Sequence, residues 1–201
     1  MSRTLIALVA ALAFGALAAC TSDDPVPLAQ EPEVEADTSS TSLEAFSSRS
    51  GVVIVKDFER IGTVSGRYGS SVEVQSMRLT DVASGEAEYG MVVRTSEGRG
   101  GLDRSGRSFV DADELGAIAE GIQYLRALDP TDRPLGDFEA NFLTRGRLEI
   151  SVFTSSDGAT LASVESGAPF GVSAFLTLEA LAEMEALVSS ARTQLDSLQS
   201  E

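Results

Sequence analysis

Four arginines lie close together in the middle of the chain with glycines between them, and residues of these types could bind an anion. The arginines are Arg94, Arg99, Arg104 and Arg107. The glycines are Gly98, Gly100, Gly101 and Gly106. Glycine allows a left-handed backbone that points several N–H groups at one anion, and arginine supplies a fork of donors. Two interpretations of residues 94–107 stay open: a loop that binds a carboxylate, phosphate or acidic sugar, and a hairpin connection whose arginines pair with carboxylates.

Carboxylates form a second group that could do chemistry. Asp111, Asp113 and Glu114 could hold Ca²⁺ or act as an acid–base pair. They also fall in the predicted first turn of a helix, where the helix dipole favours negative charge. We therefore expect Asp111 to cap this helix and Glu114, three residues later, to complete a capping box. A hydrolase built on carboxylates alone remains an alternative, because sequence does not show which acids face each other across a cleft.

The residue types that the chain lacks exclude several classes of enzyme. The sequence contains no histidine and a single cysteine, Cys20. A Ser-His-Asp triad, a Cys-His dyad, a Cys/His zinc site and an internal disulfide therefore cannot form within it. Lys56 lies beside Asp57 in a predicted half-exposed strand, which does not suit a general base. We expect no catalytic residue, no metal and no cofactor.

The start of the chain has the pattern of a secretory signal peptide. Arg3 precedes an apolar run from Thr4 to Ala19 that ends in Leu17-Ala18-Ala19-Cys20. At 1.5 Å per residue this run covers roughly 24 Å as a helix, which is too short to span a hydrocarbon core about 30 Å thick. The short apolar run and the small residues at its end fit cleavage after residue 19.

The same four residues resemble the lipobox of bacterial lipoproteins. This resemblance implies that the Cys20 thiol receives a diacylglyceryl group, that residues 1–19 are removed and that the new amino group is acylated. The protein is then expected in the cell envelope, held to the membrane by its lipid, with the outer membrane (periplasmic face or cell surface) as its location. Residues 20–24 also resemble the acidic export signal of Bacteroidetes surface lipoproteins, although these acids fit an acidic tether equally well.

Composition divides the rest of the chain into a tether and one domain. Residues 21–48 contain Pro25, Pro27 and Pro32, many Ser and Thr, and acidic but no basic side chains. Such a segment buries too little apolar area to offset the entropy of ordering, so we predict a disordered tether over residues 20–48. Residues 49–201 are predicted to form a single α+β domain.

Hydrophobic periodicity predicts the elements of this domain. Alternating or apolar runs indicate strands over residues 51–61, 71–79, 87–93, 138–142, 148–152 and 159–164. Helices are expected over residues 112–127 and from 178 to 198, the second capped by Thr177. Each helix carries a stripe of large apolar side chains for a buried contact.

An internal repeat relates the two halves. Residues 108–115 and 174–181 share an aromatic, an aliphatic, an N-cap residue and the first leucine of the helical stripe, 66 residues apart. The strands 87–93 and 148–154 also match in pattern. We predict two units of antiparallel strands followed by a helix, about residues 70–128 and 137–198, that share one core.

The order of elements over residues 70–198 resembles the strand-strand-strand-helix repeats of the PUR and Whirly families, which imply two repeats paired around crossed helices and binding of single-stranded nucleic acid. Residues 49–201 carry 24 acidic and 14 basic side chains. This charge opposes contact with phosphates, so we reject nucleic acid as a ligand.

We expect a non-catalytic binding or structural module of the envelope that contacts an envelope protein or polymer. The alternatives are the carboxylate-dependent hydrolase and a binder of small anions or sugars through residues 94–107.

Overall fold

The computed structural model describes residues 40–99, 102–129 and 134–200, and the chain from Thr38 to Glu201 forms one compact unit. The predicted signal peptide, the predicted lipid-attachment residue Cys20 and the predicted tether up to residue 39 lie outside the described residues.

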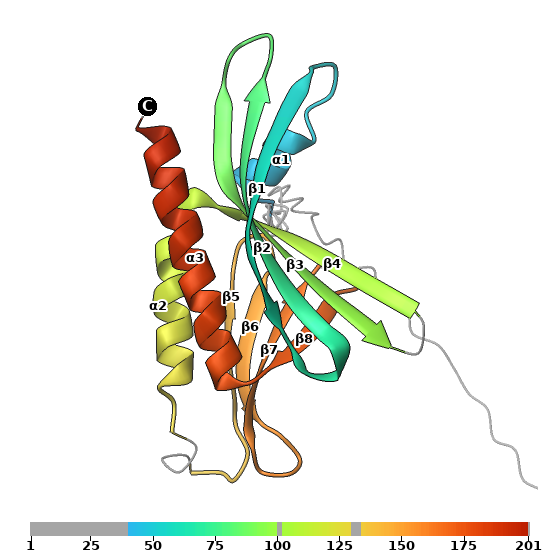
Figure 1. The fold of residues 1–201 in the computed structure, drawn as a ribbon, viewed down its shortest axis with the longest axis vertical. Helices are drawn as coiled ribbons and strands as arrows, with labels where there is room; N and C mark the ends of the chain where they lie inside the picture. The colour runs from blue at the N-terminus through green and yellow to red at the C-terminus, as the bar shows by residue number, and fades with distance from the viewer. Residues whose placement is uncertain (1–39, 100–101, 130–133, 201) are drawn as a thin grey trace, which may run out of the picture. The chain divides into compact units, whose positions relative to one another are not determined.

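The first half of the unit is a four-stranded antiparallel sheet whose strands follow the order of the sequence (Figure 1). Its strands are β1 (Ile54–Ser65), β2 (Ser70–Asp81), β3 (Ala87–Arg99) and β4 (Leu102–Asp111). The register between β1 and β2 shifts between Arg60 and Gly62, as in a β-bulge. This bulge lets an edge strand bend around the helix that packs on it.

The second half repeats the arrangement with shorter strands. They are β5 (Glu139–Leu143), β6 (Glu149–Thr154), β7 (Thr160–Ser166) and β8 (Val172–Leu176), again antiparallel and in sequence order. A helix follows each sheet directly along the chain. α2 (Leu115–Arg126) comes after β4 and a short 3-10 turn, and α3 (Leu178–Gln199) comes after β8.

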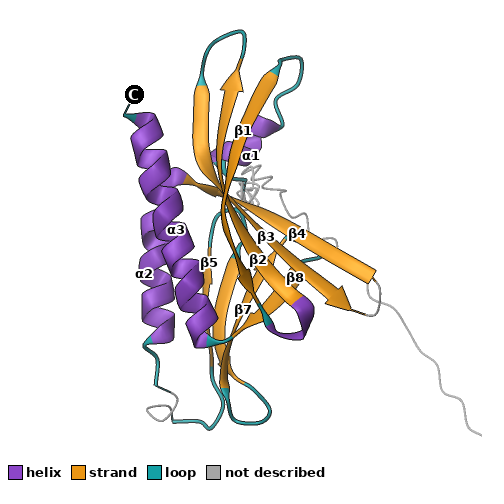
Figure 2. Cartoon of the chain, in the orientation of Figure 1, coloured by secondary structure: helices purple, strands orange, loops and turns teal. Residues whose placement is uncertain are grey.

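The two helices lie side by side and each packs on the sheet of the other half (Figure 2). α3 contacts β1 and β2 of the first sheet, and α2 contacts β5 and β6 of the second. Glycines mark both contacts: a Cβ on Gly62 of β1 would meet Leu187 of α3, and one on Gly121 of α2 would meet Phe142 of β5.

One apolar cluster joins both sheets and both helices, which confirms the predicted α+β fold with two units that share a core. The predicted helical stripes are buried. In α2 they are Leu115, Ile118, Ile122 and Leu125, and 66 residues later in α3 they are Leu181, Met184, Val188 and Ala191. The predicted cap is also confirmed, because Thr177 Oγ1 accepts a hydrogen bond from the Ala180 N–H at 3.2 Å.

The repeat contains four strands in each half rather than three. Residues 94–99 and 102–107 are the paired ends of β3 and β4 rather than parts of a loop, and the first unit begins at β1 rather than near residue 70. The glycine content suggested a loop, but Gly106 lies in a strand because β4 approaches Ser166 so closely that a Cβ would overlap its carbonyl oxygen. The match of residues 87–93 with 148–154 was therefore wrong, since these are the third strand of one sheet and the second strand of the other.

The folded unit starts earlier than residue 49. A short helix, α1 (Ser42–Ser47), begins after Thr41, whose Oγ1 accepts the Glu44 N–H at 3.0 Å. Leu43 and Phe46 are buried against Leu79 of β2. The Ser-rich, acidic composition up to residue 48 concealed this pair of apolar side chains at helical spacing, so the predicted tether is too long at its C-terminal end.

Removing the Leu43 side chain should destabilise the unit, although residue 43 falls in the predicted tether. The Leu43 side chain is fully buried, so Leu43→Ala leaves a cavity in its place. We expect the free energy of unfolding, measured by urea denaturation, to fall by about 2–5 kcal/mol. Glu44→Ala, next to it but exposed, should change it by less than about 0.5 kcal/mol. Equal stability of Leu43→Ala and the wild type would mean that α1 is not part of the folded unit.

Candidate functional site

A polar hollow of about 560 Å³ lies beside the start of α1, the end of β4 and the C-terminal part of α3. Its lining includes Ser42, Glu88, Asp111, Asp113, Arg145 and Arg192. Charged side chains from both halves of the chain therefore meet here, which makes this hollow the candidate functional site.

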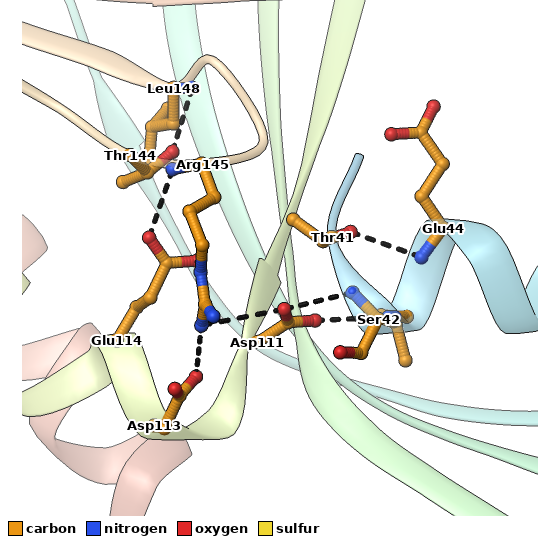
Figure 3. Close-up of polar contacts among 10 residues, drawn as sticks. Thr41, Ser42, Glu44, Asp111, Asp113, Glu114, Thr144, Arg145 and Leu148 are labelled. Carbon is orange, nitrogen blue, oxygen red and sulfur yellow. Dashed lines mark hydrogen bonds and ion pairs between the residues drawn. The ribbon is translucent and has the colours of Figure 1, made fainter. Parts of the chain in front are cut away.

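Asp111 is the most enclosed carboxylate of the hollow and is 4% exposed. Its Oδ1 accepts the Leu43 N–H at 2.9 Å and its Oδ2 accepts the Ser42 N–H at 2.9 Å (Figure 3). These are free N–H groups of the first turn of α1, where a negative charge is favourable. The prediction that Asp111 caps the helix that follows it was wrong, because its side chain makes no capping bond there and caps α1 instead.

Arg145, in the turn between β5 and β6, contacts three carboxylates of the β4–α2 junction (Figure 3). Its guanidinium lies 3.4 Å from Asp111 and 3.3 Å from Glu114, and it also donates to Asp113. The backbone N–H of Arg145 donates to Glu114 Oε1 at 2.9 Å. Glu114 therefore binds the turn of the other half rather than completing a capping box.

The turn that carries Arg145 is fixed against β4. Thr144 Oγ1 accepts the Leu148 N–H at 2.9 Å, and Thr144 O accepts the Arg147 N–H at 3.0 Å. Gly146 lies so close to the Phe109 carbonyl that a Cβ would overlap it, so only glycine fits at this position. Arg145 is thus placed by the backbone on both sides of it.

The hydrogen bonds and ion pairs of this cluster connect the two halves of the chain. Both oxygens of Asp111 accept hydrogen bonds, and the charges of Asp111, Asp113 and Glu114 face one guanidinium. Both carboxylate oxygens of Asp111 are therefore occupied by contacts within the fold. Within residues 40–99, 102–129 and 134–200, no group of three or more Cys, Asp or Glu side chains is arranged to hold a metal ion.

Glu88 lies on the other side of the hollow and is held differently. Partial burial, followed by repulsion from Asp111, Glu86 and Asp113, raises the pKa of its carboxyl above the ordinary value. Glu86 lies two residues earlier, in the exposed connection between β2 and β3, and shows the opposite effect. Its hydrogen bond with Arg49 lowers its pKa. Burial and the neighbouring acids therefore disfavour the charged form of Glu88.

The structure separates the four arginines of residues 94–107. Arg94 and Arg107 are register partners on β3 and β4 and share one face of the sheet. Arg104 belongs to the opposite face and forms an ion pair with Glu97 at 2.9 Å, while the side chain of Arg99 lies outside the description. Of the three described side chains, Arg94 and Arg107 share a face of the sheet, and Arg94 and Arg104 line one hollow near the end of the hairpin.

Arg145 is the residue of the site that the sequence did not single out. It lies in a short turn with no motif, and its partners are about 30 residues away along the chain. Lys56, which the sequence singled out only to discount it, donates to the Ser47 hydroxyl of α1 at 2.6 Å on the exposed surface.

Comparison with models of known protein families, with curated proteins and with solved structures finds no match to this chain. In the part of the chain that the structure describes, no helix is both long enough and apolar enough to cross a membrane.

Neutralising Asp111 should loosen α1. Asp111→Asn replaces one of two accepting oxygens with an N–H donor that faces an N–H of α1, so we expect a loss of about 1–3 kcal/mol in the free energy of unfolding. Asp113→Asn is the matched control, because it removes the same charge from Arg145 but is 71% exposed, and should cost less than about 0.5 kcal/mol. Equal losses from the two variants would mean that charge alone, and not capping, holds the site.

Glu88 and Glu86 should shift stability with pH in opposite directions. A raised pKa in the folded state means that folding favours the protonated form, so Glu88 lowers stability as pH rises from its ordinary pKa through the raised one. Glu88→Gln should therefore be more stable than the wild type at about pH 7 and equal to it at about pH 3.

Glu86 has a lowered pKa, so its contribution is present above its ordinary pKa and is lost as pH falls through the lowered value. Glu86→Gln should be less stable than the wild type at about pH 7 and should approach it in acid. Urea denaturation at both pH values measures these differences. The same sign of change at neutral pH in both variants would contradict the assignment of opposite environments.

Proposed function

We propose that the protein is lipid-anchored in the cell envelope, at the periplasmic face or the cell surface of the outer membrane, and that its folded unit is a non-catalytic binding or structural module. The observation that carries the proposal is the position of the only cysteine. Cys20 follows Leu17-Ala18-Ala19 at the end of an apolar run, the one place where lipid attachment requires a thiol. Two or three acyl chains, at about 0.8 kcal/mol for each buried CH₂, hold such a chain to a membrane leaflet.

The start of the folded unit supports this arrangement. The unit begins near Thr38, so about 18 residues separate it from Cys20. The proposed tether, as a flexible coil of this length, would have an end-to-end distance of roughly 25 Å, which is enough to separate the unit from the headgroups. The acidic side chains of this segment and of the unit further limit contact with an anionic surface.

The state of the carboxylates favours a binding or structural role over a hydrolase. A hydrolase with two carboxylates needs one that holds a proton and an ionised one across a cleft. The pKa of Glu88 is raised, but Asp111, the buried carboxylate of the same hollow, accepts hydrogen bonds from two N–H groups of α1 and contacts Arg145, so its oxygens do not face a substrate. The partner of such a module would be an envelope protein or polymer, and the net negative charge disfavours nucleic acid.

The test of the anchor is the covalent state of residue 20. The full chain, expressed in a bacterium with a lipoprotein pathway, should begin at Cys20, carry the added mass of acyl chains and partition into the detergent phase. Cys20→Ser should lose the acyl mass and move to the aqueous phase, because serine cannot form the thioether. Ser22→Ala, two residues away, should behave as the wild type. A wild-type chain that retains residue 1 or carries no acyl mass would overturn the proposal.

The non-catalytic part has its own test. The purified full chain is offered chromogenic glycosides and esters, and no turnover above background is expected. Turnover that Glu88→Gln abolishes and Glu86→Gln retains would replace the binding module with the carboxylate-dependent hydrolase.

A further inference from the structure

Arg94 and Arg107 form a pair of like charges on the open face of the first sheet. They are register partners on adjacent antiparallel strands, so their Cβ atoms lie about 4.5–5.5 Å apart on the same side. Neighbouring residues identify this side, because side chains alternate along a strand. Val93, next to Arg94, points into the shared core. Phe109, two residues from Arg107 and so on the same face, packs toward α1. The arginines therefore lie on the face away from the core.

The carboxylate directly across from Arg94 on β2 has other partners. Glu73 of β2 is the register partner of Arg94, but its Oε2 forms an ion pair with Arg60 at 2.6 Å and its Oε1 accepts a hydrogen bond from Gln75. Within the described residues, neither Arg94 nor Arg107 forms an ion pair. The chain has 31 acidic side chains, so this pair is not explained by a shortage of carboxylates.

The opposite face of the same hairpin shows the usual arrangement. There Arg104 lies across from its register partner Glu97 and forms an ion pair with it at 2.9 Å. Opposite charges across strands stabilise a sheet, whereas like charges directly opposite each other destabilise it. The Arg94–Arg107 pair is thus a local conflict within a consistent fold, and such conflicts concentrate at functional sites.

The surroundings of the pair suit an anion with oxygen atoms. The next row of the same face is a line of hydroxyls across all four strands, made by Ser65, Ser71, Ser96 and Ser105. A hollow of about 400 Å³ adjoins Arg94 on the side of this row, and its lining includes Ser96 and Ser105. Asp103 and the ion pair of Glu97 with Arg104 also line it, so the carboxylate of Glu97 is already neutralised there. The guanidinium of Arg107 lies over the Phe109 ring at 5.4 Å, which holds one of the two forks in place.

Charge decides which anion fits. Two guanidinium groups need two negative charges for neutrality, and their forked N–H donors match the oxygen spacing of a phosphate. Asp103, also on the rim of the hollow, is four residues from Arg107, or about 13 Å along the strand, and so does not fill the place between the arginines. We infer that Arg94 and Arg107, assisted by Ser96 and Ser105, form a binding site for a phosphate monoester dianion.

The experiment measures binding of inorganic phosphate and glycerol 3-phosphate to the full chain in non-ionic detergent, by calorimetry and by melting temperature, with ionic strength matched by sodium chloride. Both ligands should bind, more tightly as pH rises through about 6, where phosphate gains its second negative charge. Arg94→Gln or Arg107→Gln should weaken binding at least about tenfold, because each removes one forked charged contact.

Two controls separate this site from a general effect of charge. Arg126→Gln removes an arginine of α2 that forms an ion pair with Glu185 and does not line the hollow, so it should leave binding unchanged. Arg94→Gln should raise the melting temperature of the ligand-free chain, since it relieves the repulsion between the two arginines. Absence of binding by the wild type, or an equal loss in Arg126→Gln and Arg94→Gln, would overturn the inference.

A lipid headgroup and a soluble metabolite can both supply the phosphate. Dihexanoyl phosphatidic acid, used below its micelle concentration, carries the same group on a lipid. Tighter binding of this compound than of glycerol 3-phosphate assigns the site to a lipid headgroup, and equal or weaker binding assigns it to a soluble phosphate compound. The site lies within the folded unit, so phosphate binding by a chain without acyl groups on Cys20 would refute the anchor alone, and an acylated chain that binds no phosphate would refute the site alone.

Discussion

The sheet of each half of this chain packs against the helix of the other half, and the fold depends on this exchange. The helix that follows each sheet packs on the sheet of the other half, so α3 protects β1 and β2 while α2 protects β5 and β6. Apolar side chains of both sheets and both helices consequently form one cluster. An isolated half would expose the inner face of its sheet, which makes the whole unit the smallest piece with a complete core.

The sequence was informative where the cause of a structure is local. Apolar side chains at helical spacing identified both long helices, and Thr177 was recognised as a cap because its partner is three residues away. Asp111 has the same position in the repeat, yet its partners are Ser42 and Leu43, almost 70 residues away. No local pattern distinguishes the two caps, so a choice between helices made by tertiary structure could not be predicted.

The same contrast explains the errors at β4 and Arg145. Glycine usually interrupts a strand, but Gly106 is required by the close approach of β4 to Ser166, a contact between the two halves. Arg145 was not recognised because its three carboxylates come from the other half of the chain. The elements could thus be predicted from sequence, whereas the joint between the halves, which forms the candidate site, could not.

The attachment of α1 has a mechanical consequence. Tension applied at the N-terminal end of the folded unit meets α1 first, and this helix is held by Leu43, Phe46 and the bonds to Asp111. β1, the next element, is paired with β2 along most of its length and is much harder to remove. A pull on the chain would detach α1 and lengthen the extended N-terminal segment by several residues before either sheet loses a strand. α1 is therefore the element that yields first when force acts on the N-terminal segment, and the core stays intact.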